Sequence, residues 1–223
     1  MAEIEQPQTY LISPPEFELS SYADLLSRML DLHEIACVRL AMSTRDEGMI
    51  GKAADTLREI CHSRDVPLLL QSHFFLVERF GLDGVHLTDG ARSIRSARTE
   101  LGKDAIVGAF CGISRHEGLN AGEAGADYVC FGPLNENDLN AGDIADPELF
   151  AWWSEMVEVP IVAEGGLDTT KILQLKSCAD FFAYAEEIWQ QEDPIAALGA
   201  LIHAQQAQHC LLYTSPSPRD LRL

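Results

Sequence analysis

Residues 125–134 read GADYVCFGPL, and residues 160–167 read PIVAEGGL. Each stretch is a short apolar run, rich in β-branched or aromatic side chains, that stops at a glycine. A run without polar alternation is typical of a strand buried on both faces, as in a parallel sheet. The glycine permits a tight turn or a close approach of the backbone to a ligand. A helix signal follows each stretch, at residues 146–148 (DPE) and 168–170 (DTT), so both predict a strand–loop–helix unit.

The same alternation of strand and helix signals extends from these two units to the rest of the chain. Segments between the apolar runs predict helices, among them residues 73–80 and a weak one at 117–124, which contains Gly118 and Gly122. Regular alternation favours a parallel (β/α)8 TIM barrel. A doubly wound open sheet ranks lower, because no GxGxxG follows the first strand. The eight predicted strands lie at residues 10–13, 35–40, 67–71, 84–87, 105–110, 125–131, 160–163 and 181–185.

The chain of 223 residues has the length of one domain. We expect a single barrel over residues 1–209. Its loops should be short, because this fold usually takes roughly 250 residues. Residues 210–223 lack periodicity and contain two Ser-Pro steps, which resist helix formation. We predict that they form a disordered or non-native C-terminal extension.

The composition limits the partners of the protein. A net charge of −19 argues against nucleic acid, because phosphate backbones need clustered cations. The N-terminus is acidic and no apolar run approaches the length of a membrane span, which predicts a cytoplasmic protein that engages no membrane. The six cysteines show no CxxC or other metal spacing. We expect a small-molecule ligand, and a homodimer is left open because an exposed side chain of Trp152 or Trp153 would indicate an interface.

Several short motifs resemble, in order and spacing, the thiamine phosphate synthase and thiazole tautomerase family. The resemblance covers about residues 10–208 and implies a (β/α)8 barrel that acts in thiamine (vitamin B1) biosynthesis as a transferase or isomerase. The synthase of that family joins a pyrimidine diphosphate to a thiazole phosphate and uses magnesium. The motifs are GVHL at 84–87, GADYV at 125–129, Gly132-Pro133, PIV at 160–162 with Gly165-Gly166, and Ala179-Asp180.

The positions that bind the diphosphate in the family are altered after the second and third strands. The family pattern Gln-x-Arg-x-Lys reads Arg39, Ala41 and Ser43 here. Two of the three diphosphate-binding residues are therefore missing, although Arg39 adds a cation nearby. The family pair Asn-Asp, whose carboxylate holds magnesium, reads Gln71 and Ser72.

The fourth strand and the loop after the sixth differ from the family as well. The pattern Gly-Gln-x-Asp, which ends in a magnesium ligand, begins at Thr88 here and ends at Ala91. Asp89 supplies one carboxylate, offset by two positions. The loop that would grip phosphate with threonines and a lysine reads LNEND at 134–138. Since magnesium prefers one or two carboxylates plus substrate phosphates, we assign no metal ligand and leave the cofactor open.

The thiazole phosphate position is better kept, but it too has changed. The resemblance implies that backbone N–H groups of Gly165 and Gly166, with the turn at Ala185 after the eighth strand, face a phosphate. Glu164 precedes the glycines, and Glu186 stands where the family has a serine. A carboxylate beside a phosphate costs on the order of 4 kcal/mol per close pair of unit charges at an effective dielectric constant near 20. An ordinary phosphate site is therefore not expected without a cation between them.

Individual residues allow more than one interpretation. Glu164, Glu186 and Glu187 could form a cluster for acid–base chemistry or for a metal, or a solvated acidic rim. His86 could be a catalytic base, but a structural histidine anchored to backbone is favoured. No catalytic residue is assigned. The predicted ligand-binding residues, around one opening, are Arg39, Gln71, Thr88, Asp89, Glu164, Gly165, Gly166, Ala185 and Glu186.

Two hypotheses follow for the function. The first is a divergent member of the thiamine phosphate synthase family that handles a small ligand at the C-terminal face of the barrel. The second is a catalytically inactive barrel that serves as a small-molecule binding or interaction protein. The ordered motifs favour descent from this family, as in the first hypothesis. The lost magnesium and diphosphate residues favour the absence of the family's reaction, as in the second.

Overall fold

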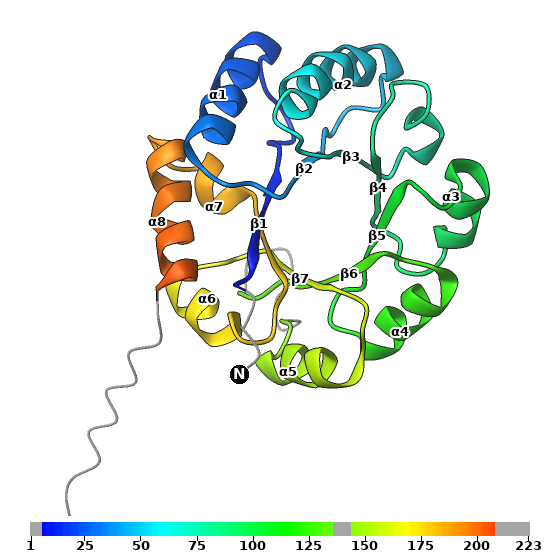
Figure 1. The fold of residues 1–223 in the computed structure, drawn as a ribbon, viewed down its shortest axis with the longest axis vertical. Coiled ribbons are helices and arrows are strands. Elements are labelled where there is room, and N and C mark those ends of the chain that lie inside the picture. Colours follow the sequence, from blue (N-terminus) through cyan, green and yellow to red (C-terminus); the bar gives the residue numbers. More distant parts are fainter. Residues whose placement is uncertain (1–5, 136–143, 208–223) are drawn as a thin grey trace, which may run out of the picture.

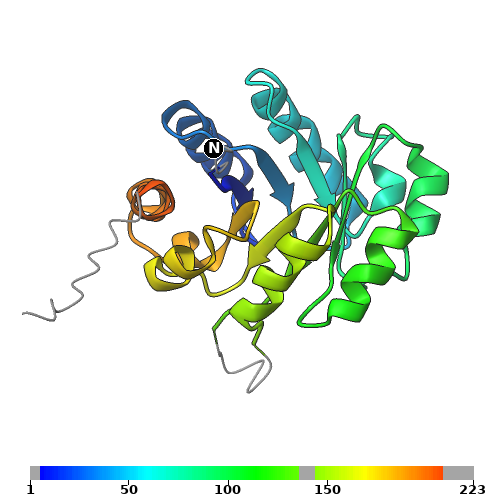
Figure 2. The same cartoon turned by 60° about the horizontal axis from the view of Figure 1, so that its bottom comes forward.

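The computed structural model describes residues 6–135 and 144–207 of the chain. Within this part, eight parallel strands join edge to edge in sequence order, and β1 pairs with β8 to close a barrel. The helices surround the strands on the outside (Figures 1 and 2). The predicted (β/α)8 TIM barrel is confirmed.

The strands are short, and a helix or turn follows each of them. The strands are β1 (Gln8–Ile12), β2 (Cys37–Leu40), β3 (Leu68–Gln71), β4 (Gly84–Leu87), β5 (Ile106–Phe110), β6 (Tyr128–Phe131), β7 (Ile161–Glu164) and β8 (Phe181–Tyr184). The helices are α1 (Leu19–Leu32), α2 (Glu47–His62), the 3-10 turn η1 (Phe74–Leu76), α3 (Ile94–Leu101), α4 (Arg115–Ala124), α5 (Pro147–Met156), α6 (Thr169–Leu175), α7 (Glu186–Trp189) and α8 (Pro194–Gln206).

Side chains leave each strand in two directions, because successive residues of a strand point to opposite faces. Those that point outward, such as Leu11 and Val38, form the main core with the buried faces of the helices. Those that point inward, such as Tyr10 and Tyr128, belong to a second cluster inside the barrel. Both faces of the strands are therefore buried, which explains the apolar runs without polar alternation.

The helices differ from the prediction in two places. Residues 73–80 hold only η1 and the hydrogen-bonded turns after it, because a short connection must bury Leu76 and Val77 and then return to β4. The short helix α7 was not predicted. It is anchored to the end of β1 by a 2.7 Å hydrogen bond from Trp189 Nε1 to the carbonyl of Ile12, a contact that local sequence does not reveal.

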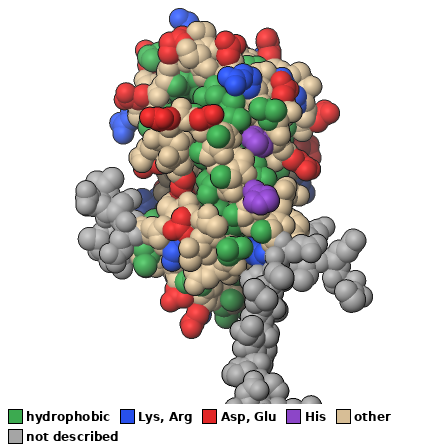
Figure 3. All heavy atoms as spheres, turned by 90° about the vertical axis from the view of Figure 1, so that its left-hand side faces the viewer, with side chains coloured by type: hydrophobic (Ala, Val, Ile, Leu, Met, Phe, Trp, Pro, Cys, Tyr) green, Lys and Arg blue, Asp and Glu red, His purple; other side chains and the backbone are tan. Residues whose placement is uncertain are grey.

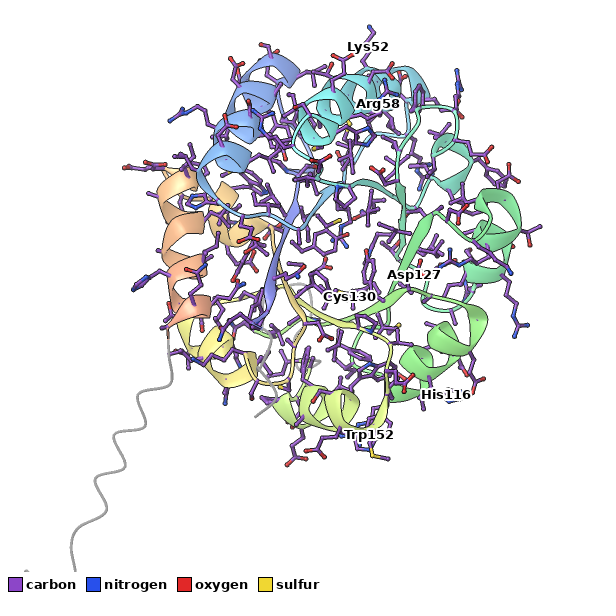
Figure 4. The ribbon with its side chains drawn as sticks, viewed as in Figure 1. Lys52, Arg58, His116, Asp127, Cys130 and Trp152 are labelled. Carbon is purple, nitrogen blue, oxygen red and sulfur yellow. The ribbon has the colours of Figure 1, made fainter. Side chains whose placement is uncertain are left out.

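The two tryptophans of α5 have different surroundings. Trp153 is fully buried and donates a 2.8 Å hydrogen bond from Nε1 to the carbonyl of Val159. Trp152 is half-buried on the outer side of the barrel (Figure 4), and the guanidinium of Arg115 lies 4.9 Å from its ring centroid. A homodimer that uses this surface stays a prediction.

Other predictions concern the surface and the end of the chain. Among residues 6–135 and 144–207, no helix has the length and apolar character of a bilayer-spanning segment. The face over α1 and α8 carries acidic side chains around a band of apolar ones (Figure 3), in line with the net charge of −19. The predicted extension at 210–223 lies outside the described residues, as do residues 136–138 of the acidic loop.

The two glycines of α4 should respond oppositely to alanine. A Cβ on Gly118 would lie 2.6 Å from the rings of Phe131 and Trp153, whereas on Gly122 the nearest atom belongs to Val159 at 3.3 Å. Gly118→Ala should therefore lower the free energy of unfolding by about 1–3 kcal/mol, the usual cost of overpacking. Gly122→Ala should raise it by up to about 1 kcal/mol through helix propensity. Urea unfolding of the two variants checks both signs, and equal effects would contradict this account of α4.

Candidate functional site

The predicted ligand-binding residues lie at one end of the barrel. Arg39, Gln71 and Glu164 are among the last two residues of β2, β3 and β7. Thr88 and Asp89 directly follow β4. Because all strands are parallel, their carboxyl ends share one rim, which is where sites of this fold are built. Gly165 and Gly166 follow β7, and Ala185 and Glu186 follow β8.

Arg39 and Glu164 form a bidentate ion pair across the top of the barrel interior. Arg39 Nη2 donates to Glu164 Oε1 at 2.5 Å, and Nη1 donates to Oε2 at 3.1 Å. The two side chains are 3% and 20% exposed. Burial alone would raise the pKa of Glu164, but the Arg39 guanidinium outweighs it and lowers that pKa to about 2. Burial would lower the pKa of Arg39, but Glu164 outweighs burial and raises that pKa. The buried cation is thus already neutralised by the protein.

Below the ion pair, three strands contribute a buried chain of polar side chains. The hydroxyls of Tyr10 and Tyr128 are 2.8 Å apart, and Tyr128 Oη lies 2.8 Å from His86 Nδ1. Burial lowers the pKa of His86 well below its usual range, so the imidazole is neutral. The predicted structural role of His86 fits this burial. However, its ring nitrogen contacts a tyrosine hydroxyl, and the expected backbone anchor is wrong.

Cys130 links the interior to the ion pair. Its side chain lies inside the ring of strands (Figure 4), and its Sγ is 3.0 Å from Glu164 Oε2. Burial raises the pKa of this thiol well above its usual range, so Cys130 is a neutral donor to the carboxylate.

Two buried nitrogen atoms near this network have no hydrogen-bond partner among the described residues. They are Nε of Arg39 and Nε2 of His86, in side chains that are 3% and 1% exposed. Buried polar groups are paired in the great majority of cases. The two unpaired nitrogen atoms are therefore exceptions to that rule within the described residues.

The two positions that would hold magnesium carry Ser72 and Ala91, which supply one hydroxyl and no carboxylate. Ser72 Oγ lies 3.1 Å from Thr88 Oγ1, and Asp89 Oδ2 accepts a 2.6 Å hydrogen bond from Ser93 Oγ. In the described part of the chain, no three His, Cys, Asp or Glu side chains are grouped to hold a metal ion. A hydroxyl is a poor substitute for the carboxylate that magnesium prefers, and the offset carboxylate of Asp89 already accepts a hydrogen bond from Ser93, so this donor set does not fit the ion.

The three acids at the β7 and β8 ends have separate partners. Glu164 points into the barrel toward Arg39. Glu186 is exposed and accepts a 3.4 Å hydrogen bond from Gln190 Nε2 on its own helix. Glu187 points back to backbone, where its carboxylate accepts hydrogen bonds from the N–H groups of Gly166, Leu167 and Ala185. These contacts describe three separate environments and not one shared acid–base or metal cluster.

Sequence reasoning did not assign Tyr10, Tyr128 or Cys130 to the site, and it named Glu187 only as a possible member of an acidic cluster. The period of two along β6 places Tyr128 and Cys130 on one face, and that signal could have found them. No local signal identifies the partners of Glu187, because two of them lie 20 and 21 residues away.

Known proteins resemble this chain both in sequence and in fold. The model of the thiamine monophosphate synthase family matches residues 9–188. A thiamine-phosphate synthase of Rhodospirillum centenum is 40% identical, over 85% of this chain and 93% of the relative. One of Erythrobacter litoralis is 35% identical, over 88% and 95%. The solved thiamine phosphate pyrophosphorylase of Pyrococcus furiosus has a TM-score of 0.76 at 22% identity, over 89% of this chain and 95% of that chain, a likeness of fold.

Proposed function

The chain belongs to the thiamine monophosphate synthase family, which supports a role in thiamine metabolism, and we propose that it binds a small heterocyclic ligand without a diphosphate at the mouth of its barrel. In the reaction implied by the family resemblance, the thiazole phosphate becomes bonded to the pyrimidine compound at the carbon that carried the diphosphate, and the diphosphate is released. Charge that develops on the leaving oxygens must be met by cations or a metal. Of the nine predicted ligand-binding residues at this mouth, Arg39 alone carries a positive charge, and it is paired with Glu164.

The Arg39–Glu164 ion pair is the observation that carries the proposal. Both terminal nitrogens of the guanidinium are engaged by one carboxylate. A diphosphate could recruit Arg39 only by breaking this pair and leaving Glu164 beside another anion. Between His116 and Pro218 the sequence offers only Lys171 and Lys176 as further lysine or arginine side chains.

The neutral groups at the mouth support a neutral ligand. Gln71, Ser72 and Thr88 present an amide and two hydroxyls at the ends of β3 and β4. Ser72 adopts φ 66, a left-handed conformation that is uncommon for a residue other than glycine and is found at functional sites. The amide of Gln71 and the hydroxyls of Ser72 and Thr88 can hydrogen-bond a heterocycle and its substituents.

A synthase assay tests the proposal. Purified protein is given the pyrimidine diphosphate, the thiazole phosphate and magnesium, and thiamine phosphate is measured. We expect turnover far below the common enzyme range of about 1–10³ per second, because one lost transition-state donor typically costs about 2.7–4 kcal/mol. Calorimetry should show that the pyrimidine alcohol binds more tightly than its diphosphate. Turnover within the enzyme range, or tighter binding of the diphosphate, would prove the proposal wrong.

A matched pair of variants isolates the role of the ion pair. Glu164→Gln removes the negative charge that neutralises the guanidinium and should increase the affinity for inorganic pyrophosphate. Glu186→Gln makes the same change of charge at an exposed side chain that does not contact Arg39, so it should leave that affinity unchanged. An equal response of the two variants would show that overall charge, and not the ion pair, sets diphosphate binding.

A further inference from the structure

The loops after β7 and β8 form a small cradle of backbone N–H groups. Gly166 N and Leu167 N donate to Glu187 Oε1 at 2.6 and 3.0 Å, and Ala185 N donates to Oε2 at 2.8 Å. Convergent backbone N–H groups of this kind are a general binding site for anions. Here the anion is a carboxylate of the same chain.

The cradle is held in place by contacts other than those with Glu187. Leu134 N donates to the carbonyl of Gly165 at 2.7 Å, and Asn135 Nδ2 donates to the carbonyl of Gly166. In a trans peptide the C=O and N–H groups point in opposite directions. Fixing the two carbonyls toward the β6 loop therefore aims the N–H groups of the next residues toward Glu187.

The glycines make this arrangement possible. Gly165 and Gly166 adopt φ 86 and 76, the left-handed region that glycine enters without steric cost. A Cβ on Gly166 would lie 2.8 Å from Asn135 Cβ, so a side chain there would displace the β6 loop. The cradle is thus defined by the backbone of two loops, and removal of the Glu187 side chain should leave it intact.

A local role in capping α7 accounts for only part of this contact. The bond from Ala185 N is local, since it spans two residues. The bonds from Gly166 and Leu167 reach across to the preceding βα loop. Each carboxylate oxygen of Glu187 is therefore used, and the N–H groups that would meet an entering anion are already filled.

The surroundings of the cradle also oppose an anion. A hollow of about 810 Å³ opens beside it, and the residues that line it include Gly166, Leu167 and Glu187. Among the described residues that line it there is no lysine or arginine, and Asp168, Glu192 and Asp193 add further carboxylates. An added phosphate would meet like charges with no cation between them.

We infer that Glu187 is a specificity-determining residue that occupies the phosphate cradle of this barrel, so that the part of the ligand facing β7 and β8 carries no phosphate. A hydroxyl group or a neutral heterocycle fits beside the Glu187 carboxylate, where it can donate a hydrogen bond. The nature of the ligand rests on the proposed function, whereas the occupied cradle can be tested with inorganic phosphate alone.

The experiment compares the wild-type protein with Glu187→Ser and with the control Glu192→Ser, at an exposed acid that lines the same hollow without contacting the cradle N–H groups. Both variants remove one negative charge, but only Glu187→Ser opens the cradle. Phosphate is titrated by NMR while the backbone amide signals of Gly166, Leu167 and Ala185 are followed. We expect saturable shifts of these signals in Glu187→Ser, with an affinity at least about tenfold above that of the wild type and of Glu192→Ser, a factor equal to about 1.4 kcal/mol.

Glu187→Gln keeps an oxygen atom for the backbone N–H groups and removes only the charge, so it serves if the serine variant does not fold. Phosphate should displace this neutral side chain, with a smaller gain in affinity than in the serine variant. The inference is overturned if the wild type binds phosphate at these amides as tightly as the folded variants do, because phosphate would then displace the Glu187 side chain without any substitution. It is also overturned if a folded Glu187 variant gains no affinity.

A second titration connects the cradle to the ligand. The wild type should bind the thiazole alcohol more tightly than its phosphate ester, and Glu187→Ser should reverse this order. A preference of the wild type for the ester would overturn the inference. If neither thiazole compound binds to the wild type, the proposed ligand class is wrong, while the phosphate titration still decides whether Glu187 occupies an anion cradle.

Discussion

Arg39→Met is expected to lower the free energy of unfolding by about 3–5 kcal/mol at pH 7, the usual cost of removing one partner of a buried ion pair. The substitution leaves the carboxylate of Glu164, 20% exposed, without the guanidinium that neutralises it. The double variant Arg39→Met/Glu164→Leu should recover most of the loss, because apolar residues of similar volume often replace a buried pair at little cost. Urea unfolding monitored by circular dichroism measures each value.

The exposed pair formed by Arg79 and Glu47 provides the control. Its side chains are 61% and 64% exposed, with Arg79 Nη1 3.1 Å from Glu47 Oε2. Arg79→Met should change stability by about 0–1 kcal/mol, as is usual for surface pairs. If Arg39→Met costs no more than Arg79→Met, the ion pair does not hold the top of the barrel interior in the way described.

Acid should remove the stability that comes from Glu164. The pKa of this carboxyl is lowered from 4.5 to about 2 by Arg39, against the effect of burial, so the unfolded chain takes up the proton at a higher pH than the folded protein. Stability is therefore fully present above about pH 4.5 and is lost as the pH falls toward about 2. The total loss is on the order of 3 kcal/mol, measured by urea unfolding at a series of pH values.

Two variants identify the group responsible. Glu164→Gln cannot titrate, so its stability should fall less steeply between pH 4.5 and 2 than that of the wild type. The pKa of Glu18 is also lowered to about 2, by hydrogen bonds from Ser20 and Ser21 at the start of α1. Glu18→Gln is therefore measured over the same pH range, to separate the contribution of Glu18 from that of Glu164. An unchanged pH profile in Glu164→Gln would show that other carboxyls cause the acid response.

The fold could be predicted because its signal is repeated along the chain. Runs such as residues 128–131 are apolar on both faces, and parallel strands inside a layer of helices require that pattern. Once the strands are assigned, Arg39 and Glu164 must lie at the same rim, because each stands at the carboxyl end of its strand. The short helix α7 escaped prediction because a contact from Trp189 to β1 anchors it.

The contacts within the site could be predicted much less well. That Arg39 pairs with Glu164 depends on how far each side chain reaches across the closed barrel, which no local pattern encodes. The same holds for Glu187, which turns away from its neighbour Glu186 to reach backbone N–H groups of another loop. Sequence shows which charges stand at a rim, whereas their pairing is set by the three-dimensional arrangement of the loops.

The position of the ion pair also bears on whether the barrel can be divided. Arg39 belongs to the half formed by β1–β4, and Glu164, 125 residues later, to the half formed by β5–β8. A fragment that contained only one half would carry a charged group in its interior with no partner, at a cost of several kcal/mol. We therefore expect the chain to fold as one cooperative unit, because neither half-barrel keeps both partners of this ion pair.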